Sequence, residues 1–377
     1  MNHHNYLNIA MLGHKHMLTR EGGIEIVVKE LATRMSKRGH HVVCYDRRIR
    51  PVNGEAMPGI RNYKGVKIVS VFTIDKKGFA AVISSFVASW RAGNSKADLV
   101  HIHGEGPALM CWIPKLRRKR IIVTIHGLDW RRAKWNRIGI WLIKLGEKTA
   151  VKSADEIIVL SRNAQDYFQR KYGRETIFIP NGVEEPEYRD ADQITKNWGL
   201  KKDSYVLYVG RIVPEKGIKC LIDAWKGMQT DKKLVIAGGS SDTENYLSEL
   251  RRLSPENVIF TGFQRGEILR ELYSNAYLYC IPSDIEGMPL SLLEAMSYGN
   301  CCVVSDIPEC TEVAEDKAVI FPKGNVLELR RTLQNLVDEP QIVEEKRAGV
   351  SDFILSKYKW DEVINKTLEL YSKVYET

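Results

Sequence analysis

The sequence predicts an α/β protein made of two doubly wound domains that face each other across a cleft. Three observations carry this prediction. Short runs rich in Val and Ile alternate with stretches of helical periodicity along most of the chain. Several of these runs are apolar on both faces, which is typical of parallel strands covered by helices on both sides. The chain has 377 residues, and single hydrophobic cores stop growing at roughly 250–300 residues, so two Rossmann-like domains are expected.

Seven strands are expected in the first half of the chain. They are Leu7–Gly13, His41–Asp46, Val66–Phe72, Leu99–His103, Ile121–His126, Ile157–Leu160 and Thr176–Ile179. A helix is expected between the first two strands, because apolar residues of the segment Gly22–Arg38 recur at helical spacing. The order strand, helix, strand implies right-handed crossovers and therefore a parallel sheet.

The second half repeats this scheme after a polar segment, Glu184–Trp198, which is expected to link the domains. Its strands are expected at Tyr205–Val209, Leu234–Ala237, Val258–Phe260, Tyr277–Ile281, Cys302–Ser305 and Val319–Phe321. The segment Trp360–Tyr375 has the apolar spacing of a terminal helix. The predicted domains are therefore residues 1–188 and 189–358, followed by a helix in 359–377 that packs back toward the first domain.

Composition excludes several classes of protein. Apolar residues make up 44% of the chain and charged residues 27%, which is unlike disordered or fibrous proteins. No apolar run approaches the ~20 residues that a membrane-spanning helix needs, and the first residues lack the pattern of a signal peptide. The seven cysteines form no C-x-x-C pair, so reduced thiols in a cytoplasmic protein are expected.

Charge is distributed unevenly along the chain. Residues 1–190 carry 33 Lys and Arg against 18 Asp and Glu, a net charge of +15, whereas the remainder carries 23 against 29, a net charge of −6. The basic half is suited to nucleic acid, anionic lipid or a phosphorylated substrate. No nucleic-acid-binding motif accompanies the charge, so nucleic acid is not expected as a partner.

The first candidate ligand-binding segment follows the first expected strand. Gly22 and Gly23 precede the first helix. Adjacent glycines let the backbone approach a ligand closely, and the helix N-terminus offers free N–H groups to an anion. The pattern is not the G-x-G-x-x-G of dinucleotide-binding proteins, and by itself it also fits a plain turn.

The second candidate is the segment 210–217, GRIVPEKG, directly after the strand Tyr205–Val209. Arg211 and Lys216 lie on a strand-to-helix loop, where a planar guanidinium and a point charge can bind a diphosphate from two sides. A solvated charged turn is the alternative interpretation.

The third candidate is the segment 283–299, in which Glu286 lies in a loop and Glu294 lies in the second turn of a helix expected over 289–298. The N–H groups of Leu290 and Ser291 lie at the start of that helix, where a phosphate is favoured. Carboxylates accept hydrogen bonds from the hydroxyls of sugars and riboses. Taken singly, each residue also fits a charged helix end or a surface position.

Together these motifs resemble those of the retaining family-4 glycosyltransferases, which have the GT-B fold. Five elements occur in the family's order and spacing over nearly the whole chain: Gly22-Gly23, His126-Gly127, Pro180–Val183, the segment 210–217, and the pair Glu286 and Glu294. A finer resemblance, carried by the EGGIE run at 21–25 and by Tyr45–Arg48, is to bacterial capsule and wall-polysaccharide members, including rhamnosyltransferases.

The resemblance implies a donor site in the second domain. Arg211 and Lys216 would bind the diphosphate of a nucleotide-sugar, with the amides of Leu290 and Ser291 completing the phosphate site. Glu294 would hold the ribose hydroxyls, and Glu286 would contact hydroxyls of the donor sugar. The base would lie against backbone near Phe263, with UDP or dTDP as the expected nucleotide.

The resemblance also implies roles for the first domain. Gly22 and Gly23 would close over the pyrophosphate, and His126 would donate a hydrogen bond near the reacting centre. In this family no side chain is firmly assigned as nucleophile, and the leaving diphosphate is thought to take the proton of the acceptor. The residues counted as catalytic are therefore His126, Glu286, Arg211 and Lys216. No cofactor and no metal are expected, because the protein cations substitute for a metal.

Other histidines and carboxylates leave alternatives open. His126 fits a structural role at a strand end as well. His101 and His103, with Glu105, have the spacing of a metal site, although acceptor contacts or structural hydrogen bonds fit them better. The only D-x-D pattern, Asp190–Asp192, lies in the polar linker, follows no strand and is taken as incidental.

Basic residues are interleaved with tryptophan in two segments, 107–120 and 130–137. This pattern suits an anionic membrane interface, and a solvated basic surface is the alternative.

The expected function is a retaining transferase that moves a hexose or deoxyhexose to a glycan or lipid-diphosphate-linked saccharide in bacterial surface polysaccharide synthesis. It would act in the cytoplasm, where peripheral binding to the inner membrane face is one option. The alternatives are a non-catalytic nucleotide-sugar-binding scaffold, a sugar-nucleotide epimerase and a phosphorylase.

Overall fold

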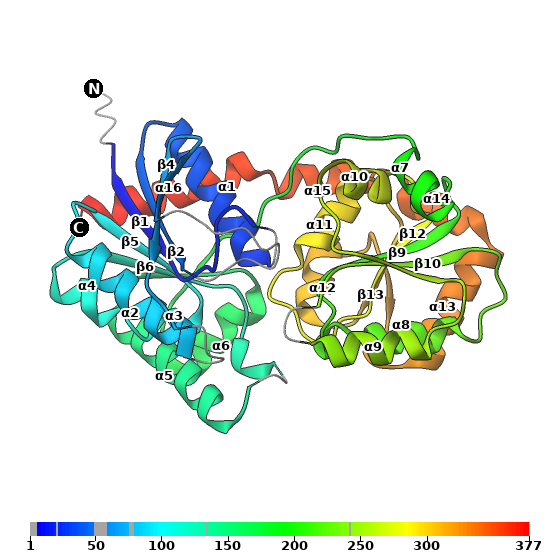
Figure 1. Ribbon diagram of the computed structural model, residues 1–377, viewed down its shortest axis with the longest axis horizontal. Coiled ribbons are helices and arrows are strands. Elements are labelled where there is room, and N and C mark those ends of the chain that lie inside the picture. The colour runs from blue at the N-terminus through cyan, green and yellow to red at the C-terminus, as the bar shows by residue number, and fades with distance from the viewer. Residues whose placement is uncertain are drawn as a thin grey trace. The chain divides into compact units, whose positions relative to one another are not determined.

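The computed structural model describes residues 6–19, 22–48, 59–74, 79–132, 135–240 and 243–376. Arg20 and Glu21 of the expected glycine loop, and Ala133 and Lys134 of the second basic segment, lie outside the described residues. The chain divides into two compact units. Unit 1 comprises Met1–Asn181 with Trp360–Thr377, and unit 2 comprises Gly182–Lys359. Each unit is a sheet flanked by helices (Figure 1), so the predicted α/β class with two doubly wound domains is confirmed.

The sheet of unit 1 has eight described strands in the order β3-β4-β2-β1-β5-β6-β7-β8. Their bounds are β1 Asn8–Leu12, β2 His41–Arg47, β3 Ile60–Tyr63, β4 Val66–Val71, β5 Leu99–His103, β6 Arg120–Ile125, β7 Glu156–Val159 and β8 Ile177–Phe178. All neighbouring pairs are parallel except β3 and β4, which form an antiparallel hairpin. The sequence analysis missed β3, because only two of its four residues are half-buried and none is buried, which leaves little apolar signal.

The helices of unit 1 cover both faces of this sheet. They are α1 Gly23–Lys37, α2 Phe79–Gly93, α3 Glu105–Ala108, α4 Trp112–Leu116, α5 Arg137–Ser153, α6 Arg162–Tyr172 and α16 Trp360–Glu376, with a 3-10 turn at Asp129–Arg131. Small residues of α2, α3 and α5, such as Ala88, Ala108 and Ala150, form one core with alternate strand residues. The terminal helix α16 contacts α1.

Unit 2 has six described strands in the order β11-β10-β9-β12-β13-β14, all parallel. They are β9 Tyr205–Val209, β10 Lys233–Ala237, β11 Val258–Gly262, β12 Leu278–Ile281, β13 Cys302–Ser305 and β14 Val319–Phe321. Its helices are α7 Gln193–Trp198, α8 Ile218–Trp225, α9 Glu244–Leu253, α10 Gly266–Ser274, α11 Leu290–Ser297, α12 Pro308–Ala314, α13 Val326–Asp338, α14 Pro340–Arg347 and α15 Val350–Lys357, with a 3-10 turn at Pro214–Lys216.

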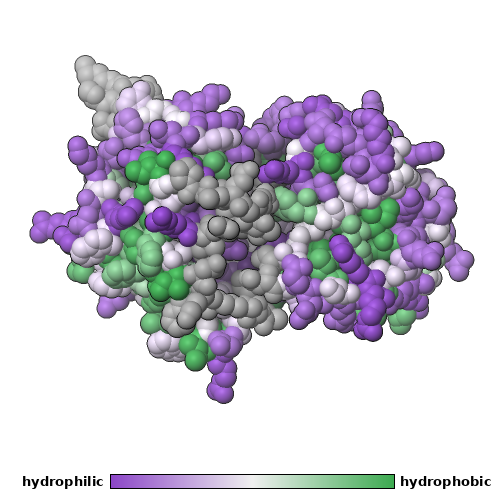
Figure 2. All heavy atoms as spheres, in the orientation of Figure 1, coloured by the Kyte–Doolittle hydropathy of each residue, from purple (hydrophilic) through white to green (hydrophobic). Residues whose placement is uncertain are grey.

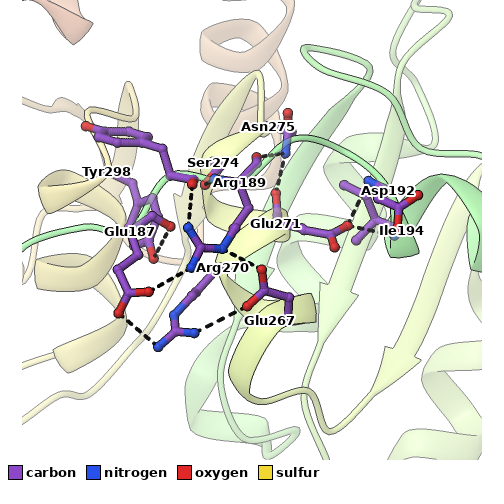
Figure 3. Close-up of polar contacts among 11 residues, drawn as sticks. Glu187, Arg189, Asp192, Ile194, Glu267, Arg270, Glu271, Ser274, Asn275 and Tyr298 are labelled. Carbon is purple, nitrogen blue, oxygen red and sulfur yellow. Dashed lines mark hydrogen bonds and ion pairs between the residues drawn. The ribbon is translucent and has the colours of Figure 1, made fainter.

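The expected linker Glu184–Trp198 is anchored on unit 2 by ion pairs and hydrogen bonds (Figure 3). Arg189 and Arg270 each bind both Glu187 and Glu267, so that the four side chains form a ring with N–O distances of 2.5 to 3.3 Å. The buried carboxylate of Glu271 accepts hydrogen bonds from the amides of Asp192 and Ile194, both at 3.0 Å. The segment therefore belongs to unit 2, and it includes the helix α7.

Candidate active site

The candidate donor-binding segments of unit 2 converge at one point of its sheet. Strands β9 and β12 are neighbours, and the order of strands runs outward from them in opposite directions. Ligands of open α/β sheets bind beyond the carboxyl ends of the strands at such a switch point. The segment 210–217 follows β9 and the segment 282–289 follows β12, so the two predicted motifs meet there.

Backbone contacts hold the loop 210–217 in place. The amides of Gly210 and Ile212 donate to the carbonyls of Ala237 and Gly239, each at 3.0 Å. Gly217 has φ +65°, and a Cβ at this position would run into the carbonyl oxygen of Pro282. Only glycine suits this conformation and this close approach, and the turn thereby fixes the position of Lys216.

Lys216 and Glu286 form an ion pair at the switch point. The Nζ of Lys216 lies 2.5 Å from Oε1 of Glu286, and the two side chains are 17% and 6% exposed. The hydroxyl of Ser283 donates to the same carboxylate oxygen at 2.7 Å. Two residues that are 70 positions apart in sequence thus lie side by side, and their ion pair keeps both side chains oriented toward each other.

Arg211 lies on the same loop, and its guanidinium has no ion-pair partner among the described residues. Its carbonyl accepts a hydrogen bond from the hydroxyl of Tyr208 at 3.1 Å. Within the described ranges, no residue forms an ion pair or hydrogen bond with its half-buried guanidinium. A half-buried unpaired guanidinium beside a lysine is suited to an anionic ligand.

The start of α11 offers further hydrogen-bond donors. Pro289 precedes the helix, and its carbonyl accepts from the amides of Leu292 and Leu293 at 3.1 and 3.2 Å. The amides of Leu290 and Ser291 donate to none of the residues that the structure describes. They are the free N–H groups that every helix start presents, and they favour an anion.

Two tyrosines that the sequence analysis missed orient the side chains of α11. The hydroxyl of Tyr279 donates to Oγ of Ser291 at 2.8 Å, and the hydroxyl of Tyr273 donates to the carboxylate of Glu294 at 3.1 Å. Both rings are buried, and nothing in the sequence distinguishes them from core aromatics. They hold Ser291 and Glu294 where the resemblance places phosphate and ribose.

Phe263 follows the edge strand β11 and is 42% exposed. Its Cβ would lie 3.5 Å from a Cβ added at Gly239, the glycine whose carbonyl binds Ile212. Phe263 therefore lies beside the loop that carries Arg211. An exposed ring next to this loop is available to a flat ligand.

In unit 1, Gly22 directly precedes α1 with an extended backbone, φ −157°. The carboxylate of Glu25 accepts a hydrogen bond from the amide of Lys15 at 3.0 Å. A Cβ at Gly22 would lie 2.7 Å from the other oxygen of Glu25. Glycine at this position therefore lets the first turn of α1 fold against the loop that follows β1.

His126 lies just past β6 and pairs with a second histidine. Its Nε2 is 3.0 Å from Nδ1 of His103, the last residue of the neighbouring strand β5. Burial lowers the pKa of His126 to about 4, although Asp129 and Glu25 act to raise it. Burial also lowers the pKa of His103 well below the ordinary value, with further lowering by His101 and His126. Both imidazoles are therefore neutral at pH 7.

His101 and Glu105 are engaged in contacts of their own. The two ring nitrogens of His101 lie 2.5 Å from the hydroxyl of Tyr371 on α16 and 2.6 Å from that of Thr124. Glu105 accepts a hydrogen bond from the amide of Asp129 at 2.8 Å. In the part of the chain that the structure describes, no three His, Cys, Asp or Glu residues are grouped to hold a metal ion. The histidines of β5 thus have the structural hydrogen bonds that the sequence analysis favoured over metal binding.

A buried carboxyl pair beneath the loop after β6 was also missed. Burial raises the pKa of Glu105 well above its usual range, and the charges of Asp129 and Glu147 add to this. Burial acts to raise the pKa of Glu147 too, but hydrogen bonds from Lys171, Tyr172 and Tyr167 lower it overall. One carboxyl is therefore neutral and the other charged, a difference that no spacing in the sequence signals.

Family models of glycosyltransferases match both halves of the chain. Residues 21–185 match the family model described as Glycosyltransferase Family 4, and residues 190–351 match the one described as Glycosyl transferases group 1. The alpha-D-kanosaminyltransferase of Streptomyces kanamyceticus is 24% identical over 73% of this chain and 77% of its own. The phosphatidyl-myo-inositol mannosyltransferase of Mycobacterium leprae is 25% identical over 94% of this chain and 93% of its own.

A solved structure shares the fold. The Anabaena protein HepE, in complex with UDP-glucose, superimposes with a TM-score of 0.81 at 16% identity, over 98% of this chain and 100% of that one. None of the helices that the structure describes is long and apolar enough to cross a membrane.

Proposed function

Because the chain is a glycosyltransferase of the GT-B fold that uses a nucleotide-sugar donor, with a family-4 domain followed by a group 1 domain, we propose that its unit 2 binds the donor at the β9–β12 switch point. The donor is a UDP- or dTDP-hexose or deoxyhexose. The acceptor is a glycan or a lipid-diphosphate-linked saccharide of bacterial surface polysaccharide, a capsule in particular, and the transfer retains the anomeric configuration. A rhamnosyl donor fits the finer resemblance of the sequence.

The observation that carries this proposal is the Lys216–Glu286 pair beside the free amides of α11. Negative charge develops on the leaving diphosphate as the glycosidic bond breaks. Lys216, Arg211 and the N–H groups of Leu290 and Ser291 are preorganised donors for that charge. When the diphosphate takes Lys216, the carboxylate of Glu286 is released to accept hydrogen bonds from the donor sugar. These cations make a metal ion dispensable for the reaction.

The remaining roles follow the same chemistry. Glu294, oriented by Tyr273, holds the ribose hydroxyls, and Phe263 lies against the base. As the resemblance implies, we assign Gly22 and Gly23 of unit 1 to the pyrophosphate and His126 to a hydrogen bond with the sugar near the reacting carbon. The proton of the acceptor hydroxyl passes to the leaving diphosphate, so no side chain acts as nucleophile.

A thermal-shift panel of UDP, dTDP, GDP, ADP and CMP, with and without Mg²⁺, tests the donor site. A ligand at 100 times its Kd stabilises by about 2.7 kcal/mol, so one nucleotide should stand out without metal. The shift should vanish in Lys216→Ala. It should persist in the matched control Lys219→Ala, because Lys219 is bound to Asp223 on α8. No shift with any nucleotide would contradict the proposal.

Two other functions remain testable on the same protein. A non-catalytic scaffold would bind the nucleotide-sugar and leave it intact on prolonged incubation, whereas a transferase hydrolyses it slowly without acceptor. An epimerase would return the epimerised sugar with no acceptor present. The described cations at the switch point, Arg211 and Lys216, support the transferase, because they suit a leaving diphosphate better than a sugar ring alone.

The acceptor class implies a membrane partner, and unit 1 carries a surface suited to one. We define the aromatic–basic surface as the exposed residues Phe86, Trp90 and Arg91 of α2 and Trp112, Leu116, Arg117 and Arg118 at α4. Figure 2 shows apolar side chains among hydrophilic ones over these helices. Trp90 and Leu116 are 51% and 74% exposed. The guanidinium of Arg117 lies over the ring of Trp90, 5.2 Å from its centroid, which joins the two helices into one surface.

This surface matches an anionic leaflet in charge and in chemistry. Neither α2 nor α4 contains an acidic residue. Amphipathic helices lie at the interface with aromatics at headgroup depth, and each basic residue near anionic lipid contributes about 1 kcal/mol. We propose that unit 1 docks peripherally on the cytoplasmic face of the membrane through this surface.

Co-sedimentation with vesicles tests the docking. Binding should require anionic lipid, weaken with salt, and fall at least tenfold in the double variant Trp90→Ala with Leu116→Ala. The matched control is Leu327→Ala, which changes a 61% exposed leucine of unit 2. Equal binding to neutral vesicles at all salt concentrations would contradict the electrostatic part of the proposal.

A further inference from the structure

His103 and His126 share a hydrogen bond, and the nitrogen that carries its hydrogen decides whether His126 offers a donor or an acceptor to a ligand. The residues Thr124 and His103 are register partners in β6 and β5, and residues two apart in a strand point to the same face. The side chain of His126 therefore follows that of Thr124 on the face that carries His101 and His103. The distance of 3.0 Å between Nε2 of His126 and Nδ1 of His103 is that of a hydrogen bond.

Only one of the two nitrogens can carry the shared hydrogen, because both rings are neutral. In the first arrangement His126 donates from Nε2, which leaves its Nδ1 as a bare acceptor and places the other hydrogen on Nε2 of His103. In the second arrangement His103 donates from Nδ1, which places a hydrogen on Nδ1 of His126 and leaves Nε2 of His103 bare. The two arrangements present opposite groups to a ligand of His126.

Surroundings favour the second arrangement. Nε2 of His103 is fully buried and lacks a hydrogen-bond partner among the described residues, and buried N–H groups without an acceptor are rarer in proteins than undersatisfied acceptors. In the second arrangement this buried nitrogen is a bare acceptor, and the hydrogen of His126 lies on its Nδ1.

The ring of His103 packs between two other histidines. It lies 4.1 Å from the ring of His101 between centroids, and it shares the hydrogen bond with His126. His101 is itself held by hydrogen bonds with Tyr371 and Thr124. The backbone of His103 packs closely against Gly13, where φ is +109° and a Cβ would run into the carbonyl of His103.

We infer that His103 is a positioning residue that holds His126 in the tautomer with hydrogen on Nδ1, so that His126 presents a hydrogen-bond donor to an oxygen of the donor sugar. This inference rests on the proposed function for the role of His126. It assigns to His103, a residue without substrate contact in the proposal, the choice between donor and acceptor at the reacting centre.

The test begins with the unaltered protein. Two-bond proton–nitrogen correlation on the full chain labelled with ¹⁵N-histidine reports which nitrogen of each ring carries hydrogen, and His126→Asn identifies the signal of His126. We expect His126 protonated on Nδ1 and His103 protonated on Nδ1. A hydrogen on Nε2 of His126 would overturn the inference, whatever the activity of the protein.

Variants of His103 then separate positioning from packing. Asn can still donate where Nδ1 lay, so His103→Asn should keep the tautomer of His126 and lie within about tenfold of the normal kcat. Asp can only accept, so His103→Asp should move the hydrogen of His126 to Nε2 and lower kcat about 100-fold, with KM for the donor within about threefold, as loss of one preorganised donor does. His103→Asp with the tautomer switched and kcat unchanged would overturn the inference.

A double-mutant cycle guards against variants that merely unfold. Because His103 acts through His126, His103→Leu should lower kcat little further once His126→Ala is present. Full additivity of the two losses would contradict the inference. Absence of transfer in the unaltered protein would instead contradict the proposed function, so the two failures are distinguishable.

Discussion

The two units assemble their functional groups by opposite means. Unit 2 uses charged side chains at the switch point, of which Lys216 and Glu286 are the clearest, and these remain partly accessible. Unit 1 uses neutral histidines buried at strand ends. All nine histidines of the chain lie in residues 1–126, hence in unit 1. The candidate groups of unit 2 therefore suit a charged ligand, whereas those of unit 1 suit uncharged hydrogen bonds.

The net charges of the units run against this local pattern. Unit 1 carries 34 Lys and Arg against 18 Asp and Glu, a net +16, and unit 2 carries 22 against 29, a net −7. The cations Arg211 and Lys216, to which we assign the diphosphate, thus belong to a unit with a net negative charge. The excess positive charge of unit 1 lies at its surface instead, including the aromatic–basic surface.

The largest effect should come from removing a cation of unit 2. Arg211→Ala deletes a preorganised donor for the leaving diphosphate, and such deletions lower kcat about 100- to 1,000-fold. The measurement is steady-state transfer or donor hydrolysis by the full chain. Arg331→Ala serves as control, because that arginine of α13 is 76% exposed and forms its ion pair with Glu328. A loss below tenfold would show that the charge of Arg211 is not used in the reaction.

Lowering the pH from 7 to 5 should reduce the free energy of unfolding of unit 1 more than that of unit 2. The folded-state pKa of His101 is lowered to about 3 and that of His126 to about 4, and that of His103 is also low. The stability that these histidines contribute to the folded state is fully present above pH 6.5. It is lost as the pH falls toward the folded-state pKa, because the unfolded chain then binds more protons than the folded chain. The stabilisation that each neutral imidazole gives to unit 1 therefore decreases as the pH falls from 7 to 5.

Glu105 acts in the opposite direction over the same window. Its pKa is raised in the folded state, so its unfavourable effect shrinks as the pH falls toward 4.5. With three histidines against one carboxyl, unit 1 should lose stability between pH 7 and pH 5, and unit 2, which contains no histidine, should lose less. Hydrogen exchange resolved by peptide, corrected for the intrinsic rate at each pH, measures each unit separately. Equal loss in both units would contradict the comparison.

Gly217→Ala should destabilise unit 2 by about 3 kcal/mol, because it adds a Cβ in a left-handed conformation against the carbonyl of Pro282. It should also displace Lys216 and weaken nucleotide binding. The matched control is Gly173→Ala, where φ is +61° but no atom lies within 4 Å of the added Cβ, so that only about 1 kcal/mol of backbone strain is expected. Urea unfolding of the two variants measures the difference.

The smallest effect on stability is expected from the ring of ion pairs that Glu187 and Arg189 form with Glu267 and Arg270. Arg189→Ala breaks two ion pairs between side chains that are 38 to 53% exposed, and exposed pairs contribute about 0.2–1 kcal/mol each. The unfolding free energy of unit 2 should therefore change only slightly, and less in high salt. A loss above 3 kcal/mol would show that the ring, rather than Glu271 and the core, holds residues 187–194 in place.

The sequence predicted the parallel sheets well because their strands are buried on both faces. The strands β5, β9, β13 and β14 have the expected bounds, since continuous Val and Ile runs end where polar residues begin. The hairpin strand β3 was not predicted, because its residues are exposed or half-buried and give little apolar signal. The switch point of unit 2 was also predictable, since both of its motifs directly follow strands.

Contacts between distant residues were not predictable from the same signals. Tyr371 meets His101 across 270 positions, and Glu271 binds the amide of Asp192 across 79. A tyrosine in a terminal helix and a glutamate in an amphipathic one look like ordinary core and surface residues. Their partners depend on how elements pack, which hydrophobic periodicity does not specify.

Localised hydrogen exchange on the full chain with and without UDP, and again with dTDP, locates the donor site. We expect one of the two nucleotides to protect peptides covering 210–217 and 286–294 at the β9–β12 switch point, and Lys216→Ala to abolish this protection. Protection confined to other strand ends of unit 2, or none with either nucleotide, would contradict the assignment of the donor site.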